Sequence, residues 1–182
     1  MSPNPITEQP TGELHGMYHD VLRGPDGRVV WERDWTHNTI VVSCRKLLAG
    51  FMKGPTISLG IQGLRVGQGL DAWDQTSPPA ATAAQTAMVD PNPYLVPSAA
   101  LQIDFLDGAN VTGTPTNRIQ IVATLGPNVP SWPDASHATA NLREFGLVGK
   151  LNNSETLINY VTHPVIVKDP ASTLTRTIWL VF

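Results

Sequence analysis

Apolar and polar residues alternate through most of the second half of the chain, and this period of two predicts β-strands. In the run LQIDFLD, Leu101, Ile103 and Phe105 fall on one face. The runs NRIQIVATL, LREFGLVGKL, TLINYVTHPVIVKD and TLTRTIWLVF continue the pattern, with turn sequences such as NNSE and PAS between them. Many short strands with turns between them predict an all-β fold, a β-sandwich or a jelly-roll-like barrel.

The same reading of the first third predicts a β-hairpin over residues 14–23 and 28–36, because GPDGR at its centre is a strong turn sequence. Trp31 and Trp35 are four residues apart on one strand, so they share a face with Val29; both are expected in the core, and so is Trp179.

One segment follows helical spacing and predicts a helix over about 39–53, packed on the β-fold. Asn38 or Thr39 could cap its start, and Gly54-Pro55 would end it. Its apolar positions are Ile40, Cys44, Leu47, Leu48 and Phe51.

Two segments do not follow either period. Residues 1–12 are polar, contain three prolines and predict an extended N-terminal arm, which leaves 13–182 as a single β-sandwich domain. Residues 71–100 form a long connection rich in Pro, Ala, Thr and Ser, with a possible helical turn at 80–88. Such a connection is uncommon in a compact domain, and a neighbouring subunit could order it.

The composition narrows the classes of function that the chain can have. Charged residues make up 15% of the 182, against a usual value of about 25%, which suits a subunit in an assembly better than a free monomer. The net charge of −3 argues against a nucleic-acid partner, and no apolar run approaches the length of a membrane span. The single cysteine, Cys44, excludes an internal disulfide. We therefore expect a soluble chain made in a cytoplasm.

Catalytic or metal-binding patterns are weak. His15 and His19 are too far apart on a strand to share one metal ion, so we expect no metal and no cofactor. Paired carboxylates for glycoside cleavage could come from Asp104, Asp107 and Glu144, but a solvated or interface face is the more frequent reason for such residues. The glycine-rich run LGIQGLRVGQG is not followed by a helix, so its glycines predict bends or close backbone contacts.

Four residues stand out as candidates for interactions. Trp73 and Trp132 lie in Pro-rich loops, and exposed loop tryptophans are typical contacts with a partner. Arg143 and Glu144 are adjacent charges within an apolar strand, so they point to opposite faces and do not pair with each other. Because an unpaired buried charge is costly, we expect backbone donors or a basic side chain at Glu144 and a carboxylate or carbonyl at Arg143.

A helix with the sequence RKLLA precedes a glycine-containing strand, and a late REFGL strand leads to LINYVTHPVIVK and a terminal LTRTIWLVF. This order of elements resembles small virion proteins of tailed bacteriophages, of the tail, baseplate or fibre kind. The matching residues are Arg45, Leu47, Leu48, Ala49, Val66, Gly67, Gly69, Arg143, Glu144, Gly146, Leu147, Asn159, Tyr160, Pro164, Lys168, Leu174, Thr175, Trp179 and Phe182. The run ATAAQTAMVDPNPY lacks the charged, leucine-rich turn expected there, which leaves the part of the virion open.

The resemblance implies a β-sandwich and a non-enzymatic structural role in a virion assembled in the host bacterial cytoplasm. Its partners would be copies of itself and other virion proteins, in a symmetric homo-oligomer formed through sheet faces, loops and the arm. Head decoration and the head–tail connector are alternative positions. A carbohydrate- or receptor-binding module on a host-surface glycan and a metal-dependent or glycosidase enzyme are the competing functions.

Overall fold

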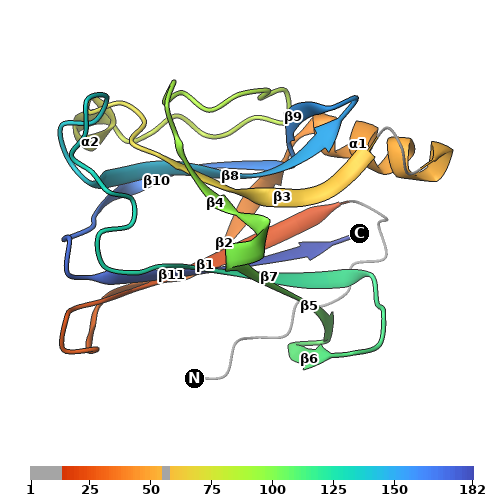
Figure 1. The fold of residues 1–182 in the computed structure, drawn as a ribbon, viewed down its shortest axis with the longest axis horizontal. Coiled ribbons are helices and arrows are strands. Elements are labelled where there is room, and N and C mark those ends of the chain that lie inside the picture. Colours follow the sequence, from red (N-terminus) through yellow and green to blue (C-terminus); the bar gives the residue numbers. More distant parts are fainter. Residues whose placement is uncertain (1–13, 55–57) are drawn as a thin grey trace.

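The computed structural model in Figure 1 describes residues 14–54 and 58–182, and it is all-β and sandwich-like. The predicted arm, residues 1–12, lies outside the described residues. The strands are β1 (His15–Arg23), β2 (Val29–Ile40), β3 (Ser58–Gly67), β4 (Tyr94–Pro97), β5 (Leu101–Asp107), β6 (Asn110–Thr112), β7 (Arg118–Leu125), β8 (Asn141–Leu151), β9 (Ser154–Leu157), β10 (Asn159–Val167) and β11 (Thr173–Val181). The helices are α1 (Val42–Lys53), α2 (Trp73–Thr76) and the short 3₁₀ helix η1 (Ser98–Ala100). None of the helices among the described residues has the length and hydropathy needed to cross a bilayer.

The strands form one antiparallel sheet in the order β4-β3-β8-β10-β2-β1-β11-β7-β5-β6, with β9 paired to β8. Only two residue pairs join β2 to β10, Ile40 with Asn159 and Thr39 with Tyr160. The sheet therefore folds over at this narrow junction into two layers (Figure 1). The upper layer in the figure contains β3, β8 and β10, and the lower layer contains β1, β11, β7 and β5.

The core lies between the two layers, as the alternation of burial along the strands shows. On β1, Tyr18, Asp20 and Leu22 are buried, whereas His19 and Val21, which alternate with them, are only partly covered. Tyr18 meets Phe145 of β8 edge to face, with ring centroids 5.0 Å apart. Burial of each such side chain contributes about 1.5–3 kcal/mol to the stability of the fold. The period-two pattern therefore determines which face of each strand is turned toward the core.

The predicted hairpin is present, but its second strand continues to Ile40 and contains a bulge. The partners of Tyr18 and Asp20 are Thr36 and Arg33, so β2 has one extra residue between these pairs. The bulge reverses the alternation. Trp31 packs against the main core, whereas the ring of Trp35 lies 4.3 Å from that of Trp179 on the other side of the sheet. The prediction that the two tryptophans share a face is wrong for this reason.

The predicted helix is present but begins at Val42 rather than at 39. Asn38 and Thr39 do not cap it, because both belong to β2 and pair with Gly16 and Tyr160. The helix is held against the sheets by its buried face, which includes Cys44 and Leu47. Gly54 follows its last residue, as predicted, and its N–H donates to the Gly50 carbonyl.

Within the stretch 80–88, where a short helical turn was possible, the long connection has one hydrogen-bonded turn in which the Gln85 N–H donates to the Thr82 carbonyl; its helix is α2, at 73–76. Residues 77–93 cross the outer face of the upper layer (Figure 1). A small second core forms beneath them, in which Val148 and Leu157 of the sheet pack with Met88 of the loop. Apolar contact with the sheet thus replaces local secondary structure in ordering this segment.

Candidate functional site

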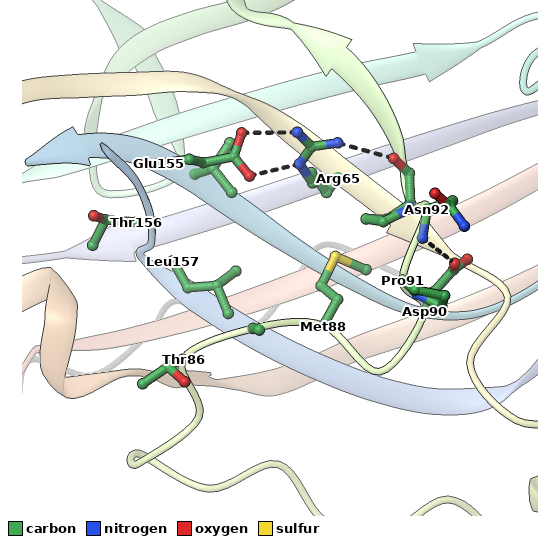
Figure 2. A pocket seen from close by; sticks show the side chains of 12 residues that line it. Arg65, Thr86, Met88, Asp90, Pro91, Asn92, Glu155, Thr156 and Leu157 are labelled. Atoms are coloured by element: carbon green, nitrogen blue, oxygen red, sulfur yellow. Dashed lines mark hydrogen bonds and ion pairs between the residues drawn. The ribbon is translucent and has the colours of Figure 1, made fainter. Parts of the chain in front are cut away.

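A polar groove of about 620 Å³ lies between the long loop and the outer face of the upper layer, and Figure 2 shows it. One wall is the loop around Met88 and Pro91, and the other is β9 with the exposed face of β3. Its lining residues are Arg65, Thr86, Ala87, Met88, Asp90, Pro91, Asn92, Pro93, Val148, Glu155, Thr156 and Leu157.

Arg65 and Glu155 form a two-pronged ion pair across the groove, with Nε–Oε1 and Nη2–Oε2 distances of 2.7 and 2.9 Å (Figure 2). The remaining Arg65 nitrogen, Nη1, donates to the Pro93 carbonyl at 2.9 Å. The guanidinium therefore ties β3 to β9 and to the end of the loop. All three of its nitrogens have a partner within the chain, which leaves it poorly suited to bind an anionic substrate.

Glu144 holds the middle of the loop from below. Its carboxylate accepts the backbone N–H groups of Val89 at 3.0 Å and Asp90 at 2.6 Å, and it also accepts the Tyr160 hydroxyl. Burial raises the pKa of Tyr160, and the hydrogen bond to Glu144 raises it further. These are the backbone donors expected at Glu144, and they make it an anchor for the loop.

Two glycines allow this close packing. A Cβ at Gly67, which pairs with Glu144, would lie 2.7 Å from Glu144 Oε1. A Cβ at Gly146 would lie 2.7 Å from the Asn159 carbonyl. Gly67, which belongs to the glycine-rich run, therefore marks a close approach, as predicted from the sequence, and Gly146 on β8 marks another.

Asp90 continues the network on the loop itself. Its carboxylate accepts the N–H groups of Gln68 and Asn92, both at 2.8 Å, and lies 3.0 Å from His137 Nε2. His137 Nδ1 lies 2.8 Å from Asp134, so the imidazole bridges two carboxylates. The ring of Trp132 stacks on the imidazole with centroids 3.8 Å apart. Burial opposes ionisation of Asp134, but hydrogen bonds from the Ser136 and His137 backbones and the His137 ring outweigh it and lower the pKa of Asp134.

Arg143 holds the start of the same connection. Its Nε and Nη2 each lie 2.7 Å from a carboxylate oxygen of Asp74 in α2, and its Nη1 donates to the Gln68 carbonyl at 2.9 Å. Asp71 lies 3.0 Å from Nη2. The hydrogen bond between Arg143 and Asp74 lowers the pKa of Asp74 and raises the pKa of Arg143. The carboxylate and carbonyl expected for Arg143 are therefore both present.

The two loop tryptophans are buried, so the expectation that they are exposed is wrong. Trp73 and Trp132 are 7% and 6% exposed. A Cβ at Gly69, where φ is +60°, would lie 2.5 Å from the Trp73 ring. Trp132 is covered by its stack on His137. Both rings pack within their own chain because the loops fold back onto the sheet.

The candidate carboxylates do not come together. Asp104 and Asp107 lie on β5 in the lower layer, while Glu144 lies on β8 in the upper layer (Figure 1). Asp104 accepts a hydrogen bond from Gln102 at 2.8 Å.

The candidate metal-binding residue His19 is on β1, where its ring stacks on Trp35 and its Nε2 lies 2.9 Å from Glu32 Oε1. Within 14–54 and 58–182, no three His, Cys, Asp or Glu side chains cluster as metal ligands.

A second charged cluster is buried in the core. Arg176 donates to both oxygens of Asp20, at 2.6 and 2.7 Å, and its Nη2 lies 3.2 Å from His163 Nε2. His163 Nδ1 lies 2.8 Å from the Pro164 carbonyl, so a neutral ring that donates there and accepts from Arg176 satisfies both contacts. Burial and the neighbouring Arg176 lower the pKa of His163 to about 3. Burial opposes charge on Asp20, but Arg176 outweighs it and lowers the Asp20 pKa.

Sequence reasoning missed Asp90, His137, Tyr160 and the Asp20–Arg176 pair. Asp90 had one usable signal, because the run Asp-Pro-Asn often forms a turn in which the Asp side chain accepts the N–H two residues later. His137 had a local partner in Asp134, three residues before it, but its contact with Asp90 and that of Tyr160 with Glu144 join residues 47 and 16 positions apart, which the sequence does not indicate.

The charged side chains that form the groove are therefore bonded to one another and to backbone groups, and these bonds hold the surface of the groove in place. Comparison with family models, with curated proteins and with solved structures gives no match to this chain.

Proposed function

We propose that the chain is a non-enzymatic structural subunit of a phage particle, of the tail, baseplate or fibre region, that assembles into a symmetric oligomer. The observation that carries this proposal is the use of the buried charges. Arg143 and Glu144 are engaged in fixing the connection from 68 to 90 onto β8. A reactive group must be available to a substrate, whereas an assembly surface must be rigid, and these bonds serve rigidity.

The surface supports assembly as well. Phe51, Ile103 and Phe182 are each 42% exposed, and all three line one apolar groove. Charged residues supply only 15% of the chain. Contiguous exposed apolar surface on a weakly charged protein is typical of a surface that a partner covers.

Contacts that fasten the long loop to the sheet explain several of the positions that carry the resemblance to phage virion proteins. Several positions that carry it are those that fasten the loop, namely Gly67, Gly69, Arg143, Glu144 and Tyr160. These positions thus serve the framework rather than a reaction. This supports a structural role in a virion assembled in the host cytoplasm with copies of itself and other virion proteins; head decoration or a connector position would use the same framework.

Electron micrographs of the purified chain test this proposal. Closed rings or other symmetric particles, with class averages of one rotational order, are the expected result. A field that contains only single particles of the 19.7 kDa subunit, both alone and mixed with lysate of phage-infected cells, would count against it.

A second candidate function, binding of a host-surface glycan, is favoured by the polar groove. Thr86, Asn92 and Thr156 bring hydroxyl and amide groups to its lining, and such groups pair with sugar hydroxyls. A glycan array tests it directly: binding that Asn92→Ala abolishes would support it. An array without signal at high protein concentration would remove it.

A further inference from the structure

An apolar groove of about 240 Å³ opens at the end of the molecule where α1 and the C-terminus lie (Figure 1). Leu48 and Phe51 of α1 and Ile61 of β3 contribute one side. Ile103 of β5, Ile119 of β7 and Phe182 contribute the other. The groove thus continues the core of the sandwich out to the surface.

The start of the folded chain lies beside this groove. Leu14, the first described residue, packs against the main core. His15 pairs with Val181, and the next residue, Phe182, lines the groove. Residues 1–13 therefore join the fold at the rim of the groove.

From this juxtaposition we infer that the groove is the docking site for the N-terminal arm of a second copy of this chain, with Ile6 as the side chain that enters it. The inference rests on the proposed assembly function. Ile6 and Met1 are the large aliphatic residues of positions 1–13, and the groove has room for a side chain of this size. Pro3, Pro5 and Pro10 favour an extended arm, which loses less entropy on docking than a flexible one.

The proposed symmetric assembly favours a second copy over the same chain. The chain enters β1 at the rim of the groove, where His15 pairs with Val181, so an arm that starts at this rim can reach the rim of a neighbouring copy. Ile6 lies eight residues before Leu14, so an extended arm can place it about 26 Å from Leu14, at about 3.3 Å per residue, which is enough to reach the groove of a copy that packs against the rim. Two copies placed rim to rim can exchange arms reciprocally, as a two-fold interface requires.

A disulfide experiment tests the docking. Cys44 is the only cysteine of the chain, and it lines this groove. The variant Ile6→Cys, oxidised with copper phenanthroline and oxygen, should give a covalent dimer on a non-reducing gel. Docking raises the local thiol concentration, so the dimer should form on the order of a hundredfold faster than with Asp26→Cys, a control in the exposed β1–β2 turn.

Two outcomes would overturn the inference. One is a monomer with an intrachain disulfide, which would show that each arm occupies its own groove. The other is a dimer that forms no faster than with Asp26→Cys. Because burial raises the pKa of Cys44 to about 11, both variants are compared at the same pH and over hours.

A second pair of variants separates docking from assembly as such. Ile6→Asp should raise the concentration at which the chain associates by about tenfold or more, while Thr7→Asp, one position along, should leave it within about twofold. An oligomer that is insensitive to both changes would end the arm inference and leave the assembly function standing. A wild-type chain that stays monomeric would end both.

Discussion

At the scale of single residues, Glu144 and Arg143 are charges that are buried together with their partners. Glu144 is fully buried and accepts two backbone N–H groups and a hydroxyl, and Arg143 is 1% exposed and forked onto Asp74. Removing one member of such a set leaves the other members buried without a partner, which costs more than the bond itself contributed.

We therefore expect Glu144→Gln to lower the free energy of unfolding by about 3 kcal/mol, because an amide replaces one acceptor by a donor that faces N–H groups. Urea denaturation measures this. The matched control is Glu155→Gln, whose partner Arg65 is partly exposed, and it should cost about 1 kcal/mol or less. Equal losses for the two variants would contradict the anchoring role of Glu144.

The buried His163 predicts an acid-labile core. Its pKa is about 3 in the fold against about 6.5 in the unfolded chain, so between these values the unfolded chain takes up the proton and stability falls as the pH falls. Asp20, with a lowered pKa, adds a loss in the same direction below about pH 4. His163→Gln should reduce the slope of stability against pH between pH 4 and 6 by about 1.4 kcal/mol per unit. A slope that does not change in urea titrations would refute the neutral buried imidazole.

Residue-level prediction from the sequence worked where it rested on the cost of an unpaired charge. That cost alone required partners for Arg143 and Glu144, and both have them. It failed for Trp73 and Trp132, because a loop composition does not reveal whether the loop folds back on the sheet. His137 was missed because its contact with Asp90, 47 residues away, forms only in the fold, while Trp132 and Asp134 lie near it in the chain without forming a recognised motif.

At the scale of elements, β8 organises the upper layer. Consecutive residues of this strand hold two stretches of one long connection: Arg143 fixes 68–74, and Glu144 fixes 89–90. Between these points, Thr162 donates to the Pro79 carbonyl and the Val42 N–H donates to the Ala83 carbonyl. The irregular loop is thus fastened to the sheet at intervals.

Hydrogen exchange read by mass spectrometry should resolve these two anchors. Arg143→Lys removes the fork to Asp74 and should speed exchange in residues 68–76, because one ammonium group cannot replace three guanidinium contacts. Glu144→Gln should speed exchange in residues 86–92 instead. If either variant accelerated exchange equally across both stretches, the anchors would not be separate.

Element prediction succeeded for the longer apolar runs: β5, β7, β8, β10, β11 and the body of α1 were predictable from the sequence. The short strand β6 was not predicted, and β9 begins within the sequence NNSE that was expected to be a turn. The start of α1 was not predictable, because pairing of Asn38 and Thr39 in β2 competes with local capping and prevails. The bulge in β2 was invisible for a related reason, since it depends on register against β1.

At the scale of the whole molecule, the two layers leave one end open. Apolar side chains from α1, β5 and the C-terminus remain exposed there, and their burial against another chain would contribute free energy to association. The fold-over at the β2–β10 junction and the open groove both depend on contacts between residues distant in sequence, so neither could be predicted from the sequence. The composition indicated only that assembly is favoured.

Single substitutions at the groove should weaken association without unfolding the subunit. Ile103→Ser and Phe182→Ser remove half-exposed apolar groups, so each should raise the association midpoint by about tenfold. Val111→Ser is the control, since Val111 is 56% exposed on β6 and does not line the groove. Sedimentation velocity gives the midpoint, and thermal melting checks the fold. Equal effects of Val111→Ser and the groove variants would contradict the assignment of this surface.

Native mass spectrometry of the purified wild-type chain, measured over a series of concentrations, tests assembly most directly. We predict one dominant oligomer whose mass is an integral multiple of 19.7 kDa and which dissociates into intact subunits on activation. A chain that remains a 19.7 kDa monomer at every concentration, and that takes up no other virion protein when mixed with them, would contradict the account.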